Sequence, residues 1–207
     1  DRIGVAFQDN EFGKLMMPVV EAAAKELGAT LVASAPLAVD GSTSAQAVGT
    51  ISQARPMAVL LIAVGPSVVG FVRAAKAGLN VPTYSLSVAA SAVPALGAEA
   101  RGLAMTQIVP FPWRQVNPMA RDFNREAAAA DVPVSYSSYG GYLGARFLIE
   151  ALRRAAPNIT SDSIVRAIQG IRGWELGGNP LHFSPTNHPG STGVEISIVG
   201  PDGRFMR

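Results

Sequence analysis

The first half of the chain repeats one pattern: a short apolar run typical of a buried strand, a loop, and in most cases a helical stretch. Four such runs start at Ile3, Thr30, Ala58 and Thr83, so the unit recurs about every 25 to 28 residues. Strands that alternate with helices at this spacing predict an α/β fold with a parallel sheet between helices. In open sheets of this kind, ligands bind beside the carboxyl ends of the strands. We therefore expect function in the loops at residues 8–12, 35–37, 63–66 and 85–87.

The composition indicates a globular protein. A chain of 207 residues with 48% hydrophobic content can bury one full core, or one core and part of a second lobe. The longest apolar run, Met57 to Val64, is far shorter than the ~20 residues that a membrane helix needs, so we expect no insertion into a membrane. The net charge is only +2 and the basic side chains are scattered singly, which argues against a nucleic-acid partner.

The residues that carry enzyme chemistry in many α/β proteins are missing. The loop after the first strand, Gln8 to Gly13, has neither the spaced glycines nor the lysine of a phosphate-binding loop. The chain has no cysteine, which excludes thiolate catalysis and zinc–thiolate sites. His182 and His188 lie in a proline-rich segment without a carboxylate at ligand spacing, so structural or solvated roles are favoured over metal binding. We expect no enzyme activity, no cofactor and no metal site.

Several residues at the expected sheet edge have two interpretations. The polar residues 9–11 could form an acidic catalytic cluster, but a helix start needs N-capping groups there, and capping is favoured. Among them, Asn10 is also a candidate ligand contact. Phe12 is either the first core residue of the helix or part of the wall of an apolar ligand site. Ser85 and Ser87 either donate hydrogen bonds to a ligand or cap the end of a strand.

The first helix is expected to cover one face of the sheet and to end at Gly28. Pro18 lies within it, which predicts a later start or a kink. The apolar positions that define its buried stripe fall three or four residues apart. They are Phe12, Leu15, Met16, Val19, Val20, Ala23 and Leu27.

The second half of the chain departs from the repeating pattern. After a fifth strand at Leu103 to Val109, residues 110–113 (Pro-Phe-Pro-Trp) form a stiff segment where the chain can pass to another compact unit. The alternating run Val194 to Val199 and the turn residues 201–203 predict a two-stranded edge element at the tail. Helical stretches are expected at Asn117 to Ala130, Tyr136 to Ala156 and Ser161 to Gln169.

Five short motifs, taken in order, resemble one protein family. They are Arg2-Ile3-Gly4-Val5-Ala6 followed by Asp9-Asn10-Glu11-Phe12-Gly13, then Val72-Arg73-Ala74-Ala75-Lys76-Ala77-Gly78-Leu79, Ala100-Arg101-Gly102-Leu103, and Tyr136-Ser137-Ser138-Tyr139-Gly140-Gly141-Tyr142. Their order and spacing resemble the C-terminal portion of a type I periplasmic solute-binding protein of ABC importers, specifically the branched-chain amino-acid (Leu/Ile/Val) receptor family. The similarity extends over nearly the whole chain.

The resemblance implies an architecture of two Rossmann-like α/β lobes that close on a ligand. Residues 1–107 with 186–207 would form a nearly complete second lobe. Residues 108–185 would form the remaining part of the first lobe, whose N-terminal portion is absent. The helices after Trp113 would then present an incomplete hydrophobic face, which could lead this fragment to associate with itself.

The resemblance also implies a ligand site at the strand ends. Family members place an aromatic residue where Phe12 stands, and a residue from the third strand's end at positions 63–65, which are Ala63, Val64 and Gly65 here. They place a further aromatic or apolar residue near Tyr136. The amino-acid receptors also hold the ligand's ammonium group with an acidic residue, and that position is Ser87 here.

The function implied is a non-enzymatic receptor, periplasmic or lipid-anchored outside the cell, that binds a small molecule and docks on the permease subunits of an ABC importer. Because Ser87 carries no charge, a small organic acid is a better candidate ligand than an ordinary α-amino acid. One alternative is a ligand-sensing receptor domain of the same fold. A less favoured one is a small flavodoxin-like enzyme, for which neither a phosphate loop nor an acidic phosphoacceptor cluster is found.

Overall fold

The computed structural model describes residues 1–207, which divide into two compact units. Unit 1 contains Asp1–Gln107 and Ile196–Arg207, and unit 2 contains Ile108–Glu195. Unit 2 thus ends at Glu195, ten residues later than the expected boundary after Pro185. The reason is that residues 186–195 are tied to unit 2, where the His182 backbone donates to Gly190 O at 2.8 Å and accepts from the Asn187 side chain at 2.7 Å. That the units are lobes of one receptor stays a prediction.

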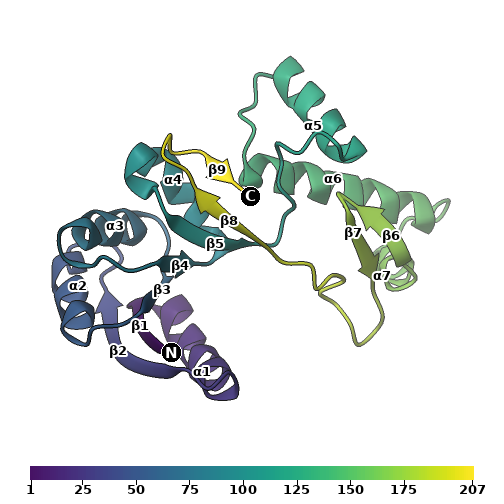
Figure 1. Ribbon diagram of the computed structural model, residues 1–207. Helices are drawn as coiled ribbons and strands as arrows, with labels where there is room; N and C mark the ends of the chain where they lie inside the picture. Colours follow the sequence, from purple (N-terminus) through teal and green to yellow (C-terminus); the bar gives the residue numbers. More distant parts are fainter. The chain divides into compact units, whose positions relative to one another are not determined.

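Unit 1 is built on one seven-stranded sheet with the order β2-β1-β3-β4-β5-β8-β9 (Figure 1). The first five strands in this order pair in parallel, and β8 pairs with β9 antiparallel at the sheet's edge, which confirms the α/β class and the expected tail element. The strands are β1 (Arg2–Gln8), β2 (Thr30–Leu37), β3 (Ala58–Ile62), β4 (Thr83–Ser85), β5 (Leu103–Gln107), β8 (Glu195–Val199) and β9 (Phe205–Met206).

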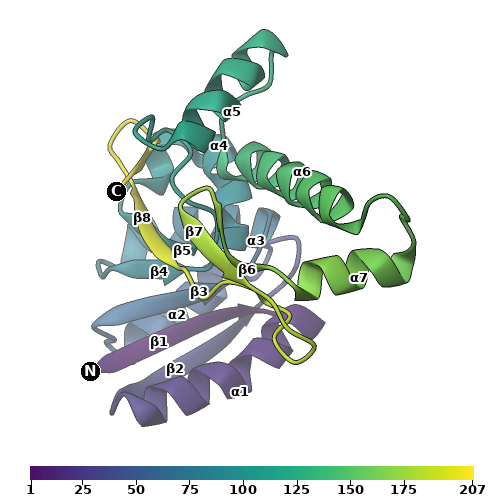
Figure 2. The same cartoon turned by 90° about the vertical axis from the view of Figure 1, so that its right-hand side faces the viewer.

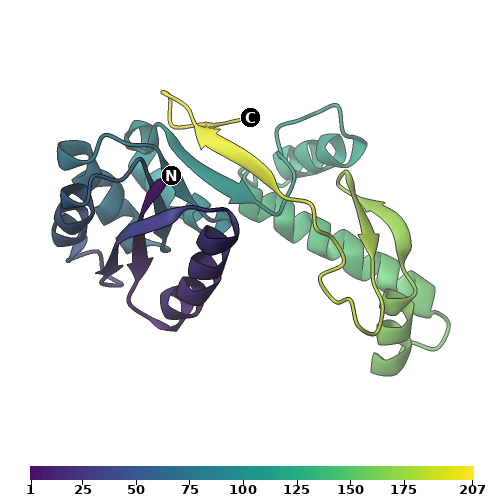
Figure 3. The same ribbon diagram turned by 60° about the horizontal axis from the view of Figure 1, so that its bottom comes forward.

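Helices lie on both faces of this sheet. Figures 2 and 3 show α1 on one face, whereas α2 and α3 lie on the other. This follows from the strand order, because right-handed crossovers that run in opposite directions along a sheet place their helices on opposite faces. The helical elements are α1 (Glu11–Glu26), α2 (Ser44–Gln53), α3 (Pro66–Gly78), η1 (Ser87–Ala92), α4 (Val93–Leu96) and η2 (Gly97–Ala100).

The main core lies between the sheet and the helices α2, α3 and α4. Ala6 and Leu61 on the strands pack there with Ile51 of α2 and Phe71 of α3, and all four are fully buried. No residue of α1 belongs to this cluster. Most of the apolar surface that unit 1 buries therefore lies on this one face of the sheet. Its removal from water is the main contribution of this face to stability.

Helix α1 corrects one expectation. It starts at Glu11 and continues through Pro18, so the helix does not start later than its apolar pattern. The side that packs on the sheet carries small residues, because Gly13 and Ala24 are buried. The expected stripe is wrong at Leu15, Val19 and Leu27, which are 70%, 57% and 80% exposed, and at Ala23, which is also exposed.

Unit 2 consists of three helices and one hairpin. The helices are α5 (Pro118–Ala129), α6 (Tyr136–Ala155) and α7 (Ser161–Gln169), and the antiparallel hairpin is formed by β6 (Arg172–Leu176) and β7 (Asn179–His182). The hairpin lies along α6 (Figures 1 and 3), and Leu176 packs against the buried cluster that contains Tyr139 and Leu143 of α6. Sequence analysis missed this hairpin.

The helices of unit 2 leave apolar side chains in solvent, as the resemblance implies. Leu148 and Ile149 of α6 are 53% and 45% exposed, and α7 has no buried residue. The buried cluster is correspondingly small. None of the helices in the structure combines the length and the apolar character that crossing a membrane requires.

Candidate functional site

The sheet brings all four expected segments to one edge, although residues 35–37 are the end of β2 itself, with Leu37 opposite Gln8, and not a loop. β1, β3 and β4 are neighbours and parallel, with Phe7 opposite Ile62 and Leu61 opposite Ser85. The segments that leave these strands therefore emerge side by side. We call this edge the rim; it contains the candidate residues Asn10, Phe12, Ala63, Val64, Gly65, Ser85 and Ser87.

Two neighbouring loops of the rim are fastened together by Gln8. This side chain, at the end of β1, is only 1% exposed, and its Oε1 accepts a hydrogen bond from the Val64 backbone at 3.2 Å. Ser67, which is fully buried, donates to Val64 O at 2.9 Å. Buried groups that hold a loop from both sides restrict its motion. Sequence analysis included Gln8 in the expected loop at residues 8–12 but gave it no role of its own; an amide that ends an otherwise apolar strand was the available signal.

The first loop positions Phe12 through a helix cap. Asn10 Oδ1 accepts from the Gly13 backbone at 3.1 Å, the N-cap geometry that the sequence favoured. The Asp9 carboxylate accepts from the Lys14 ammonium group at 2.9 Å, and this hydrogen bond raises the pKa of Lys14. Asp9 and Asn10 are thus occupied in shaping the loop. Phe12, in the first turn of α1, is half-buried.

The loop after β3 changes direction at Gly65. Its φ of 61° lies in the left-handed region that glycine adopts without strain, and Pro66 then starts α3. Ala63 is fully buried, whereas Val64 and Gly65 keep part of their surface in solvent. Of these three candidates, only Val64 therefore presents a side chain at the rim.

The two serines of the rim differ in their surroundings. Ser85 is 2% exposed and donates to Leu61 O at 2.6 Å, so its hydroxyl proton is used between β4 and β3. Ser87 is half-buried and begins η1. The structural interpretation is favoured for Ser85, and Ser87 keeps the position from which a hydroxyl can contact a ligand.

Tyr136 belongs to unit 2 and is described in its own surroundings. It is the first residue of α6, after a capping box formed by Ser135 and Ser138. Its ring is 7% exposed and lies edge-on to Phe111 and Trp113, with centroids 6.3 and 5.7 Å away. Sequence analysis treated residues 110–113 only as a connecting segment and missed this aromatic cluster.

The structure contains no group of three or more His, Asp or Glu side chains arranged to hold a metal ion. His188 lies with Nε2 2.9 Å from Pro185 O in a loop of unit 2. Two of the polar side chains at or beside the rim are already engaged: the Ser85 hydroxyl donates to a backbone carbonyl, and the Asp9 carboxylate is paired with Lys14. The arrangement offers an apolar and hydroxyl-bearing surface, which can bind a small molecule.

A family model described as "Periplasmic binding protein" matches residues 1–204. The chain belongs to the periplasmic binding protein family. Its α/β fold and the motifs noted in the sequence agree with the type I members of this family. As a family, periplasmic binding proteins bind small ligands and work with ABC transporters.

Solved structures support the same assignment. A substrate-binding periplasmic protein from Ralstonia solanacearum is 29% identical (TM-score 0.83), and the match covers 99% of this chain and 60% of that one. An extracellular ligand-binding receptor from Verminephrobacter eiseniae is 27% identical (TM-score 0.86), covering 100% and 61%. A branched-chain amino acid ABC transporter protein from Thermus thermophilus with bound valine shares the fold at 21% identity (TM-score 0.84), covering 99% and 58%.

The chain therefore spans about 60% of the length of these relatives. A search of curated proteins gives no significant match.

Proposed function

We propose that this chain is part of the solute-binding component of an ABC importer, located in the periplasm or anchored to a membrane's outer face. The observation that carries the proposal is the rim, where Phe12, Val64 and Ser87 follow three neighbouring parallel strands. A ligand held at such an edge in one lobe is enclosed when a second lobe closes over it by a hinge motion. The closed form would then dock on the permease subunits.

The ligand we propose is a small organic acid without an α-amino group. In the amino-acid receptors that this chain resembles, a carboxylate after the fourth strand holds the ammonium group, and Ser87 stands there instead. An ammonium group buried without an opposite charge costs several kcal/mol, whereas a neutral group tolerates a neighbouring hydroxyl. Phe12 and Val64 supply apolar surface for a hydrocarbon body.

Thermal unfolding of the complete protein with leucine and with 4-methylpentanoate, which is leucine without its amine, tests the ligand class. A bound ligand at a hundred times its Kd stabilises by about 2.7 kcal/mol, enough for a shift of several degrees in Tm. We expect 4-methylpentanoate or a related acid such as benzoate to raise Tm, and leucine to leave it unchanged. Stabilisation by leucine and by no acid that lacks the amine would contradict the proposal.

Substitution of Ser87→Glu provides a matched variant. It restores a carboxylate at the position that would face the ammonium group, so leucine should now raise Tm and the acids should lose their effect through charge repulsion. Ser91→Glu is the control, because Ser91 is exposed and lies four residues further along the chain. This variant should keep the wild-type preference for the acids over leucine.

A further inference from the structure

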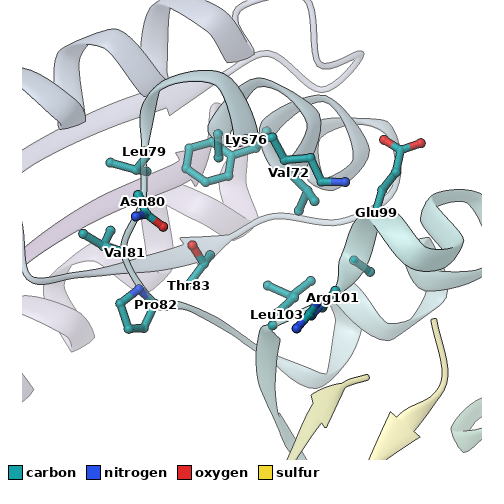
Figure 4. Close-up of a pocket in the computed structure, with 14 residues that line it drawn as sticks. Val72, Lys76, Leu79, Asn80, Val81, Pro82, Thr83, Glu99, Arg101 and Leu103 are labelled. Carbon is teal, nitrogen blue, oxygen red and sulfur yellow. The ribbon is translucent and has the colours of Figure 1, made fainter. Parts of the chain in front are cut away.

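Unit 1 has a pocket at the edge of the sheet opposite the rim. Its volume is about 580 Å³, enough for a small molecule. It lies beside the starts of β4 and β5, whereas the rim lies beside the carboxyl ends of β1, β3 and β4. Figure 4 shows the loop of residues 79–83 on one side of the opening and residues 99–103 on the other, with α3 above. The proposed cargo site does not include any of these segments.

The pocket has an apolar wall. Phe71 and Leu103 line it and are 0% and 3% exposed. Val72, Leu79 and Val81 are half-buried, so each keeps apolar surface open to the cavity. A hydrocarbon or aromatic body that entered would remove this surface from water, which is favourable by about 25 cal/mol for each Å².

The charges around the pocket favour an anion. The lining includes the exposed residues Lys76 and Arg101, and neither forms an ion pair or a side-chain hydrogen bond. The single carboxylate, Glu99, is bound by the Arg73 guanidinium at 3.0 and 3.4 Å, so its charge is already balanced. Two positive charges, one on α3 and one on the segment of residues 99–103, are therefore left over at the margin of a partly apolar cavity.

A structural role accounts for only one of these two cations. Lys76 lies in the last turn of α3, where a positive charge offsets the helix dipole. Arg101 is the C-cap residue of η2, just before β5, but η2 is only four residues long, so its aligned peptide dipoles sum to much less than those of α3. Asn80 and Thr83 add side-chain groups that can donate hydrogen bonds to an oxyanion in the same cavity.

We propose that this pocket is a second binding site, specific for small organic anions with an apolar body, in which Lys76 and Arg101 hold the anionic group and the Phe71–Leu103 side receives the body. It is separate from the rim, so its occupant need not be the transported solute. An anion bound there would bridge α3 to the start of β5 and stabilise unit 1.

The test is a titration of the complete, isotope-labelled protein with benzoate and with its neutral analogue benzamide, followed by the backbone amide NMR signals. We expect benzoate to shift the signals of Thr83 and Gly102 at the pocket with a saturable curve, and benzamide to bind at least about tenfold more weakly because it lacks the charge. Shifts of the Phe12 and Val64 signals report on binding at the rim independently. The proposal for the pocket and the proposal for the rim can therefore be refuted separately.

Charge variants complete the test. Lys76→Glu and Arg101→Glu should each weaken benzoate binding at the pocket about tenfold or more, and Lys76→Gln should do so with less disturbance of α3. Arg121→Glu makes the same charge change on the exposed surface of α5 in unit 2 and should have no effect. The proposal is overturned if benzoate leaves Thr83 and Gly102 unshifted, if benzamide binds equally well, or if charge reversal at the pocket does not weaken binding.

Discussion

Gly13 lies so close to the end of β1 that no other residue fits there. A Cβ at this position would come 1.9 Å from Gln8 O, far inside van der Waals contact, and the atom it meets is backbone that cannot rotate away. The same stretch of chain carries Asn10, which caps α1, and Phe12 at the rim. The position of Phe12 therefore depends on a glycine one residue later.

Substitution of Gly13→Ala should lower the free energy of unfolding by about 3 kcal/mol, because α1 must move away from β1. Gly49→Ala is the matched control: Gly49 lies in α2, and a Cβ there meets nothing within 4 Å. That variant should be more stable by about 0.5–1 kcal/mol, since alanine is the better helix former. Urea unfolding measures both, and equal effects of the two substitutions would contradict the close approach at Gly13.

Tyr139 carries a buried hydroxyl without a hydrogen-bond partner. The residue is fully buried in the cluster of unit 2, where its ring lies 4.9 Å from that of Phe123. Burial, with a smaller contribution from the charge of Tyr142, raises the pKa of Tyr139 to about 12. An unsatisfied buried hydroxyl costs stability, so Tyr139→Phe should be neutral or stabilising at pH 7.

The raised pKa also predicts a pH dependence. The folded state keeps Tyr139 neutral, so its contribution to stability is complete below pH 10 and is lost as the pH rises from 10 toward 12, where the unfolded chain ionises first. Wild-type Tm should therefore fall more steeply than that of Tyr139→Phe across this interval. Parallel Tm curves for the two proteins between pH 8 and 12 would show that the phenol is not desolvated.

At the scale of elements, apolar runs identified the strands of unit 1 correctly, but apolar spacing did not identify the buried side of α1. The large apolar side chains of that helix lie along one side and its small residues along another. The small residues Gly13 and Ala24 let the helix approach the sheet, so their side is the buried one. The hairpin of β6 and β7 was missed for a different reason. Its turn residues Gly177 and Gly178 both have positive φ, and with Pro180 they made the segment resemble a loop.

Glutamine substitutions on α1 test which side is buried. Leu15→Gln and Val19→Gln should each change the free energy of unfolding by less than about 0.5 kcal/mol, because both side chains lie mainly in solvent. Ala24→Gln, on the buried side, should cost about 2 kcal/mol through overpacking and the burial of an amide. If the substitutions at Leu15 and Val19 lowered the free energy of unfolding as much as the one at Ala24, these two side chains would have to be buried, which would contradict the structure.

At the scale of the whole molecule, the repeat of strands and helices was enough to predict the rim, because parallel strands necessarily end at the same edge. It was not enough to predict what fastens the rim: the hydrogen bond from Val64 to Gln8 joins residues 56 positions apart and has no local sequence signal. The boundary of unit 2 after Glu195 has a long-range contact as well, because the Phe111 backbone donates to the Glu195 carboxylate at 3.2 Å from 84 positions away. The pocket between α3 and the starts of β4 and β5 likewise appears only once the chain is folded.

Ligand binding at the rim is the central claim, and isothermal titration of the complete protein with 4-methylpentanoate tests it most directly. Phe12→Ala removes the aromatic side chain that we place against the ligand, whereas Leu15→Ala removes an exposed one from the same helix. We predict that Phe12→Ala weakens binding about tenfold or more and that Leu15→Ala leaves Kd unchanged. Equal affinities of the wild type and Phe12→Ala would contradict the account.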